Sequence, residues 1–259
     1  MPYMQIRDCR LFYAAHKAEN SLNSLVLIHG AAGSHLDWPG DLRRLTDASV
    51  FAIDLPGHGR SSGPARSTIS EYAEDILEIV NTVGVQRQIL VGFSMGSAIA
   101  LMAALRSGSF LGGLALIGSA PRLQVSPVLL ENLAINSDAA LQFIIKYSWS
   151  KNAPDLIVDR AREQLSKVPT ATIMSDYVAC NGFDIKDQLA LIKVPTLVIS
   201  ASNDRMTPPR FGQALAAGIP NSRMFTIADA GHMVILEKPD ELTDSIQQFV
   251  TDISQQRRT

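Results

Sequence analysis

The sequence predicts an α/β fold in which helices flank a mostly parallel central sheet and a helical cap is inserted into the chain. Short continuous apolar segments, typical of strands buried on both faces, alternate with helical segments through residues 1–121. The alternation stops between Arg122 and Leu191, where the pattern is helical and punctuated by prolines, and it resumes at Val194. We therefore expect a core formed by 1–121 and 192–259 and a helical cap formed by 122–191.

The composition is that of an ordinary globular chain. Of its 259 residues, 46% are hydrophobic and 19% are charged, and the formal net charge is −2. Because no basic cluster occurs apart from Arg257 and Arg258, this balance argues against a nucleic-acid partner. The longest apolar runs are too polar for a membrane span and the first residues lack the pattern of a signal peptide, so we expect no stable membrane insertion and a cytoplasmic location. The sequence carries no indication of the oligomeric state.

The two cysteines, Cys9 and Cys180, fall in regions that we do not expect to be neighbours. The chain has no Cys-x-x-Cys motif and no cluster of histidine and cysteine with the spacing of metal ligands. We therefore expect two unpaired, partly buried thiols, no metal site and no cofactor.

Strands are expected wherever short apolar segments occur. Met4 to Ile6 and Arg10 to Ala14 alternate between apolar and polar residues, which predicts an antiparallel pair at the edge of the sheet. Largely apolar segments predict further strands at Leu25 to Ile28, Val50 to Asp54, Ile89 to Val91, Leu114 to Gly118 and Val194 to Ser200, and a last strand is expected at Arg223 to Ile227.

Helices are expected where apolar residues recur at helical spacing. Thr68 and Glu71 form a capping box ahead of a helix from Tyr72 to Val83, which Gly84 closes. The other helices are expected at Ser97 to Leu105, Val128 to Ile135, Ala139 to Tyr147, Leu156 to Leu165 and Asp240 to Ile253.

The stretch Gly92-Phe-Ser94-Met-Gly96 joins a buried strand to a helix with no room for a loop. A serine at the apex of so tight a turn needs residues without a Cβ two positions before and two positions after it, and Gly92 and Gly96 meet this need. The turn also aims the N–H groups at the start of the helix toward the serine. Ser94 is therefore the candidate nucleophile.

A small-residue loop, His29 to Gly33, follows another buried strand. Attack by a serine on a carbonyl group needs two N–H donors that stabilise the developing oxyanion. The candidates are the backbone N–H groups of Ala31 and of Met95, which directly follows Ser94. We expect His29 to support the loop rather than to act in catalysis.

A serine hydroxyl also needs a base, and imidazole, with an ordinary pKa of about 6.5, is mostly unprotonated at neutral pH. His232 follows the last strand, where the sheet can bring it over the serine. We expect His58 to belong to a structural turn held by Asp54 and Arg60, and His35 to line the substrate pocket.

Asp204 is the candidate carboxylate that orients the imidazole, because it follows its own buried strand in a polar turn. Asp229 lies three residues before His232 and is expected to cap the histidine loop. No carboxylate occurs in Gly118-Ser-Ala120, which excludes an acid after the sixth strand.

Taken together, these motifs resemble those of the α/β-hydrolase family, in its small cap-bearing esterase and lipase-like branch. The stretches that carry the resemblance stand in the family order and are His29-Gly30, Asp54 to Ser61, Gly92 to Gly96, Asp204 to Pro208 and Ala230 to His232. The resemblance covers nearly the whole chain outside the cap. It implies an α/β-hydrolase fold with Ser94 as nucleophile, His232 as general base and then acid, and Asp204 as the orienting acid.

The nucleophile narrows the reactions that this fold could perform. Haloalkane dehalogenases and epoxide hydrolases of the fold carry aspartate in place of Ser94, so they are excluded. Carbon–carbon hydrolases typically have tryptophan after the catalytic histidine, where this chain has Met233, and a thioesterase for acyl carrier protein needs a basic docking face, which the cap does not offer. Both stay open as alternatives, together with a slow-turnover receptor for a small molecule.

We expect a carboxylesterase-like serine hydrolase whose partner is a small-molecule ester. The cap supplies many apolar side chains and keeps its charges on the polar faces of its helices, which favours uncharged esters with short to medium acyl chains. The residues expected to bind the substrate are His35, Phe93, Leu123, Leu129, Trp149 and Met233.

Overall fold

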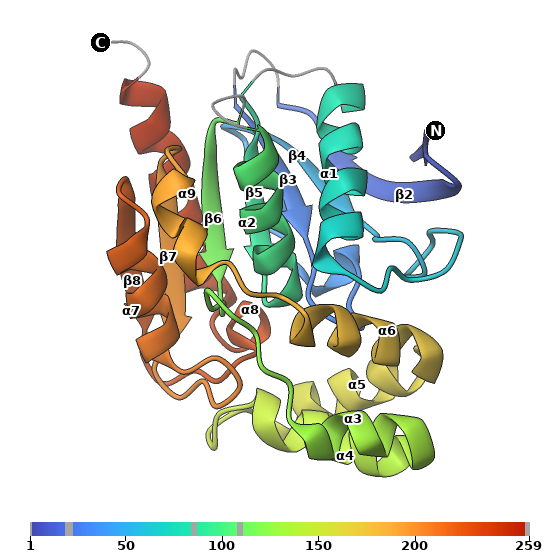
Figure 1. Cartoon of the computed structure of the whole chain (residues 1–259). Helices are drawn as coiled ribbons and strands as arrows, with labels where there is room; N and C mark the ends of the chain where they lie inside the picture. Colours follow the sequence, from blue (N-terminus) through green and yellow to red (C-terminus); the bar gives the residue numbers. More distant parts are fainter. Residues whose placement is uncertain (1, 19–22, 84–86, 108–110, 257–259) are drawn as a thin grey trace.

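The computed structural model describes residues 2–18, 23–83, 87–107 and 111–256. Eight strands form one sheet in the order β1-β2-β4-β3-β5-β6-β7-β8 (Figure 1). The strands are β1 (Tyr3–Ile6), β2 (Cys9–His16), β3 (Ser24–Ile28), β4 (Ser49–Ile53), β5 (Ile89–Phe93), β6 (Gly113–Ile117), β7 (Thr196–Ala201) and β8 (Ser222–Ile227). β2 pairs antiparallel with both β1 and β4. In the sheet order from β4 to β8, every neighbouring pair is parallel.

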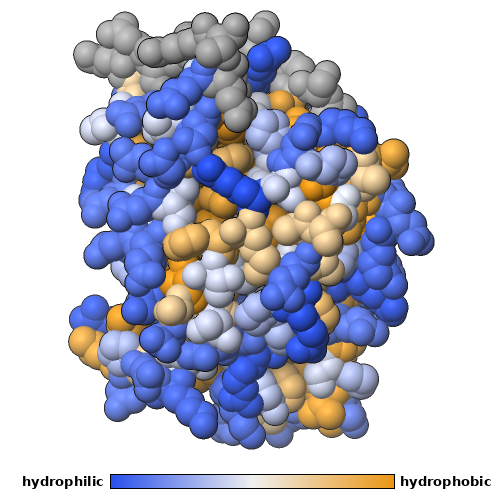
Figure 2. Space-filling model, turned by 90° about the vertical axis from the view of Figure 1, so that its left-hand side faces the viewer, coloured by the Kyte–Doolittle hydropathy of each residue, from blue (hydrophilic) through white to orange (hydrophobic). Residues whose placement is uncertain are grey.

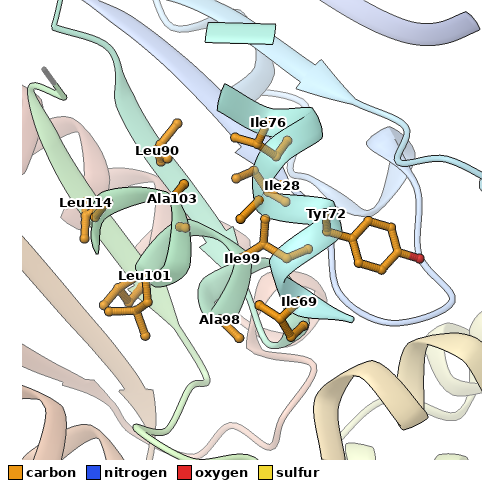
Figure 3. Packing of buried hydrophobic residues seen from close by; sticks show 14 of the residues in the cluster. Ile28, Ile69, Tyr72, Ile76, Leu90, Ala98, Ile99, Leu101, Ala103 and Leu114 are labelled. Carbon is orange, nitrogen blue, oxygen red and sulfur yellow. The ribbon is translucent and has the colours of Figure 1, made fainter. Parts of the chain in front are cut away.

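Helices cover both faces of the sheet, because each central strand is apolar on both sides. The helices are α1 (Ile69–Val83), α2 (Met95–Ser107), α3 (Pro127–Ile135), α4 (Ser137–Ser148), α5 (Asp155–Ser166), α6 (Thr170–Asn181), α7 (Pro209–Gly218), α8 (Val234–Glu237) and α9 (Pro239–Gln256). Val26 and Leu90 pack with α1, α2 and α7, whereas their neighbours Leu25 and Val91 pack with α9. Figure 3 shows the first of these layers, in which side chains of α1 and α2 meet those of β3, β5 and β6.

The strand register brings the carboxyl ends of the parallel strands level with one another. Ile28 of β3 lies opposite Gly92 of β5, and Ile117 of β6 lies opposite both Phe93 of β5 and Ile199 of β7. The loops that follow these strands therefore meet at one edge of the sheet, which is where ligands bind in open α/β sheets. The cap helices α3 to α6, between β6 and β7 in the chain, lie at this same edge (Figure 1).

The predicted fold class is confirmed, and each expected strand is present within about three residues of its predicted bounds. The prediction missed α6, which carries a weak pattern of apolar residues, and it also missed α7 and the short α8. Gly84, expected to close α1, lies outside the described residues. The Thr68 hydroxyl accepts a hydrogen bond from the Glu71 backbone N–H at 3.2 Å, as expected for the start of α1.

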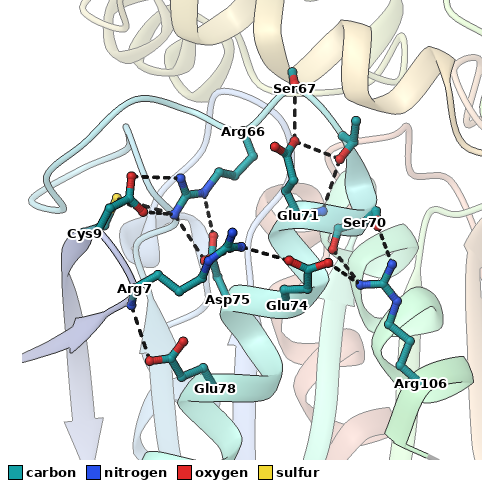
Figure 4. Close-up of polar contacts among 12 residues, drawn as sticks. Arg7, Cys9, Arg66, Ser67, Ser70, Glu71, Glu74, Asp75, Glu78 and Arg106 are labelled. Atoms are coloured by element: carbon teal, nitrogen blue, oxygen red, sulfur yellow. Dashed lines mark hydrogen bonds and ion pairs between the residues drawn. The ribbon is translucent and has the colours of Figure 1, made fainter.

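A polar network ties α1 to the antiparallel edge and to α2 (Figure 4). The Arg66 guanidinium contacts Asp75, which is fully buried on α1, at 2.8 Å and Asp8 at 2.7 Å. Glu74, one residue earlier on the helix, bonds Arg7 and Arg106 at 3.0 and 3.1 Å. This network is not part of the candidate site, which forms where the carboxyl ends of the parallel strands meet.

At the side of the sheet away from β1, the edge strand is β8, which α7 and α9 flank. Figure 2 shows this side of the molecule, where apolar and polar side chains are interspersed. Phe225 of β8 is exposed, and Arg223 pairs with Asp252 of α9. Charged residues on an edge strand disfavour pairing with further strands.

The start of α2 packs very closely on β3 and β5 at the turn where β5 ends. A Cβ added to Gly96 would lie 2.0 Å from the Ile28 carbonyl oxygen, and one added to Gly92 would lie 2.3 Å from the Gly96 carbonyl oxygen. Both contacts are with backbone atoms, which cannot rotate aside. The start of α2 therefore rests directly on the end of β3.

We expect Gly96→Ala to lower the free energy of unfolding by about 1–3 kcal/mol, because the added methyl group forces α2 away from β3. Gly182→Ala is the matched control, since its Cβ would meet atoms no closer than 3.7 Å and its φ of −82° suits alanine. It should change stability by less than about 0.5 kcal/mol. Urea denaturation measures both, and equal stabilities of the two variants would contradict the close packing.

Candidate active site

Ser94 lies at the apex of the turn between β5 and α2. Its φ of +52° is in the left-handed region, which is strained for a residue with a side chain. The turn is held by the Ser94 N–H, which donates to the Ile117 carbonyl at 2.8 Å, and by the buried Ser97 hydroxyl, which donates to the Gly92 carbonyl at 2.6 Å and accepts from the Ile117 N–H at 3.0 Å. β6 therefore supports the strained conformation that raises Ser94 above the sheet.

His232 connects Ser94 to Asp204. Its Nε2 is 2.9 Å from the Ser94 Oγ, and its Nδ1 is 2.8 Å from the Asp204 Oδ2. His232 and Asp204 are both buried. Since a carboxylate can only accept, Nδ1 carries the proton and Nε2 is left to accept one from the serine hydroxyl. The three candidate catalytic side chains are thus in one hydrogen-bonded line.

The Asp204 carboxylate is held by three further donors. The backbone N–H groups of Met206 and Thr207 donate to its Oδ1 at 2.8 Å each, and the Thr207 hydroxyl donates to its Oδ2 at 2.7 Å. Burial by itself opposes ionisation, but the His232 ring and these hydrogen bonds hold the pKa of Asp204 below its ordinary value. Asp204 is therefore ionised and fixed in orientation at neutral pH.

The histidine loop is attached to the end of α4. The Met233 N–H donates to the Ser148 carbonyl at 2.9 Å, and the Glu237 carboxylate accepts from the N–H groups of Gly231 and Ser150 at 3.0 and 3.2 Å. A Cβ at Gly231 would lie 2.3 Å from the Ser150 nitrogen, so this approach requires glycine. One end of the cap therefore positions the residue next to His232.

The candidate oxyanion donors lie at the same sheet edge, Ala31 on the loop after β3 and Met95 at the start of α2. Within the described part of the chain, neither the Ala31 N–H nor the Met95 N–H has a hydrogen-bond partner, so both are free to bind an oxyanion. Ala32, which follows Ala31, has a φ of +57°, and its N–H donates to the Asp176 carboxylate of α6 at 2.7 Å.

The two histidines expected to be structural, His29 and His58, are both buried and hydrogen-bonded. His29 supports its loop as predicted, since its Nδ1 is 2.7 Å from the Gly30 carbonyl and its Nε2 accepts from the Leu55 N–H at 3.1 Å. Burial and the nearby His58 lower the pKa of His29 to about 4, so this ring is neutral. The His58 Nε2 contacts Asp176 of α6 at 2.8 Å, a partner that was not predicted from the sequence.

Asp54 holds the turn that contains His58, as expected, and it also binds His35. Its carboxylate accepts from the backbone N–H of Arg60 at 2.9 Å, and from the backbone N–H and the Nδ1 of His35 at 2.7 and 2.8 Å. No partner for the His58 ring itself was predicted from the sequence. The partner of His58 is 118 positions away and lies on the helix that the prediction missed.

A cavity of about 330 Å³ opens beside Ser94 and His232, between the sheet edge and the cap. Its apolar and aromatic lining consists of Leu123, Val125, Leu129, Phe143, Tyr147, Tyr177, Cys180 and Met206. Its polar lining consists of Gln124, Ser126, Arg205 and Thr207, with Ser94 and His232. Two of the predicted substrate-binding residues, Leu123 and Leu129, are therefore in the lining.

The other four predicted substrate-binding residues lie outside the cavity lining and correct the expectation. His35 is buried against Asp54 and Phe12. Phe93 is buried against the His232 ring, with ring centroids 5.2 Å apart. Trp149 is buried beside Gly231, and Met233 packs with the cluster that contains α9.

Arg205 is a cavity residue that the predicted substrate-binding residues did not include. Its guanidinium lies 4.5 Å above the Tyr147 ring and donates to the Lys146 carbonyl at 3.2 Å. Among the described residues, no carboxylate is within ion-pair distance of it. Its position directly after Asp204 was the available clue, because a residue adjacent to the acid lies at the same sheet edge.

Among the described residues, no group of three or more histidine, cysteine or acidic side chains could hold a metal ion. Cys9 and Cys180 are both free and buried. No described helix has the length and apolar character that a membrane crossing requires.

Comparison with known proteins gives consistent matches. A family described as "Alpha/beta hydrolase family" matches residues 25–245. A Pseudomonas savastanoi protein, RutD, whose name assigns it provisionally to carbamate hydrolysis, is 29% identical over 88% of this chain and 94% of its own length. The structures of an esterase from Exiguobacterium antarcticum and of an enol-lactonase from Burkholderia xenovorans superpose with TM-scores of 0.88 and 0.89, at 22% and 23% identity. Each covers 96% of this chain, which in turn covers 98% and 100% of those two chains.

We expect Asp204→Asn to lower kcat by about 10⁴-fold, because an amide at this position favours the wrong tautomer of His232. Asp229→Asn is the matched control. We expected Asp229 to cap the histidine loop, but its side chain is exposed, and the φ of +53° at this position is one that asparagine tolerates. Ester hydrolysis by both variants at pH 7 measures the difference, and a larger loss in Asp229→Asn would overturn the assignment of the acid.

Proposed function

Because the chain belongs to the α/β-hydrolase family, we propose that it is a serine hydrolase of small to medium uncharged carboxylic esters. The observation that carries the proposal is the continuous line of hydrogen bonds from Ser94 through His232 to Asp204, at 2.9 and 2.8 Å. This arrangement supplies an activated hydroxyl, a base and a fixed counter-charge for the imidazolium that forms.

In the proposed mechanism, the Ser94 Oγ attacks the ester carbonyl carbon while its proton passes to the His232 Nε2. The tetrahedral intermediate collapses, the carbon–oxygen bond to the alcohol breaks, and His232 returns the proton to the leaving alcohol. Water then attacks the acyl-serine with His232 again as base, which releases the carboxylic acid and restores Ser94. Asp204 stays ionised throughout and holds the imidazole in place.

The N–H groups of Ala31 and Met95 would stabilise the negative charge on the carbonyl oxygen in both tetrahedral intermediates. Their lack of partners within the described residues supports this role. The apolar and aromatic cavity walls favour a substrate with an apolar acyl or alcohol group, at about 0.8 kcal/mol per buried methylene.

A second candidate is hydrolysis of esters that carry a carboxylate, and the position of Arg205 favours it. The guanidinium lines the same cavity as Ser94 and has no acidic partner among the described residues. A carboxylate group of the substrate could pair with the Arg205 guanidinium through a bidentate contact. In this case one end of the substrate would lie at Arg205 and its ester carbonyl at Ser94.

The relatives widen the panel of substrates that should be compared. A carbamate or an enol-lactone presents a carbonyl carbon that the same serine could attack. Carbon–carbon bond hydrolysis, thioester hydrolysis and binding of a small molecule as a receptor also remain alternative functions. Repeated turnover of an oxygen ester would separate the enzyme from the receptor.

We expect Ser94→Ala to abolish ester turnover while the fold is kept, with a loss of several orders of magnitude and a remnant of about 10³-fold over the uncatalysed rate. In the native chain, a fluorophosphonate should label Ser94 and block turnover. Kinetics with p-nitrophenyl butyrate, combined with mass spectrometry of the labelled peptide, checks both results. Near-full activity of the variant would remove Ser94 from the mechanism.

With p-nitrophenyl esters from acetate to palmitate, kcat/KM should rise by up to about fourfold per methylene until the cavity is filled, and then fall. An anionic ester, p-nitrophenyl hydrogen succinate, should be a poor substrate. If it is the best one and Arg205→Gln removes the preference without affecting the butyrate, the second candidate replaces the first. A carbamate and a thioester measured in the same series rank the remaining alternatives.

A further inference from the structure

Asp176 is a fully buried carboxylate that the proposed mechanism does not use. It projects from α6 of the cap and accepts three hydrogen bonds from the core. The Tyr72 hydroxyl donates to its Oδ1 at 2.7 Å, while the Ala32 N–H and the His58 Nε2 approach its Oδ2 at 2.7 and 2.8 Å. In Figure 3 the Tyr72 phenol extends away from the apolar contacts between α1 and α2.

The geometry around His58 makes this contact an ion pair. The His58 Nδ1 is 2.9 Å from the Pro56 carbonyl, which can only accept, and the Nε2 faces the carboxylate, which also accepts. Both ring nitrogens therefore carry protons. Burial alone would lower the pKa of His58, but the facing Asp176 charge raises it above the ordinary value.

The bond to Ala32 places Asp176 next to the candidate oxyanion hole. Ala32 follows Ala31 directly, and its φ of +57° is one that an alanine holds only when its surroundings impose it. A charged acceptor on the Ala32 N–H is strong enough to do so. The orientation of the peptide between Ala31 and Ala32 therefore depends on a side chain of the cap.

The same helix also forms a wall of the cavity. Tyr177 and Cys180, one and four positions after Asp176, are part of the cavity lining. α6 is therefore in contact with both the substrate space and the loop that carries Ala31.

We propose that Asp176 is a positioning residue, which holds the Ala31 loop in the conformation that binds the oxyanion. This inference rests on the proposed function, because it assigns to Asp176 the placement of a donor in the proposed mechanism. The cap then does more than enclose the substrate, since its Asp176 carboxylate positions the loop that carries the Ala31 N–H, one of the two oxyanion donors.

The test is the rate at which a fluorophosphonate labels Ser94, measured beside kcat and KM for p-nitrophenyl butyrate. Labelling passes through a charged phosphoryl oxygen at the oxyanion hole and does not require the natural substrate. Asp176→Asn keeps the shape of the side chain but removes its charge, and we expect it to lower the labelling rate and kcat by about 10-fold or more with little change in KM.

Asp75→Asn is the matched control, because Asp75 is also fully buried and ion-paired but belongs to the Arg66 network, outside the site. It should lower Tm while it changes the labelling rate less than twofold. Tyr72→Phe removes the partner of Oδ1 and leaves both contacts of Oδ2, so it should also stay within about threefold. A trifluoromethyl ketone, which forms a stable oxyanion, should bind Asp176→Asn more weakly in proportion to the loss of kcat.

The result that overturns the inference is a labelling rate, kcat and ketone affinity in Asp176→Asn equal to those of Asp75→Asn. The milder Tyr72→Phe and a comparison of Tm keep the test valid if Asp176→Asn is strongly destabilised, because a purely structural effect would scale with Tm in all three variants. If the native chain itself is not labelled, the proposed function fails together with this inference. Labelling of the native chain without turnover of any ester would overturn the proposed substrates alone.

Discussion

The contact between Gly96 and the end of β3 is the constraint on which the candidate site depends. With no side chain at position 96, the first turn of α2 rests on the Ile28 carbonyl, and this closeness forces Ser94 into the left-handed region at the edge of the sheet. The cost of such a conformation is about 1–3 kcal/mol, and the hydrogen bonds to Ile117 offset it. The other loops converge on Ser94 because the strands before them end at the same level.

Much of the fold could be predicted from the sequence, because the parallel strands are short continuous apolar segments that few other structures explain. The residues of the Ser94, His232 and Asp204 line could be proposed for a related reason. Each directly follows or closely follows such a strand, so local sequence fixes its place in the fold. The bounds of α1 and α9 were close to those predicted because both helices have a strongly amphipathic pattern.

What could not be predicted depends on contacts between distant parts of the chain. Asp176 binds groups that are 104 to 144 positions away, and its helix has little amphipathic pattern because several of its faces are covered. The cavity lining was predicted at Leu123 and Leu129 but not at Arg205, because the cap can be placed on the sheet in many ways that the sequence does not distinguish. Phe93 and Trp149 are large and apolar, and they were assigned to the cavity although both are buried outside its lining.

The attachments of α4 bear on how this protein could be rebuilt by exchanging segments with a relative. Ser148 and Ser150 bind the loop that carries His232, so a chimera that replaced residues 122–191 with another cap would also replace atoms that place the core's own histidine. Such an exchange would succeed if the donor segment keeps, after the helix that replaces α4, a backbone of the same course that can pack against Gly231 and donate to Glu237. Whether two such proteins can be recombined at the ends of the cap therefore depends on these few backbone contacts within it.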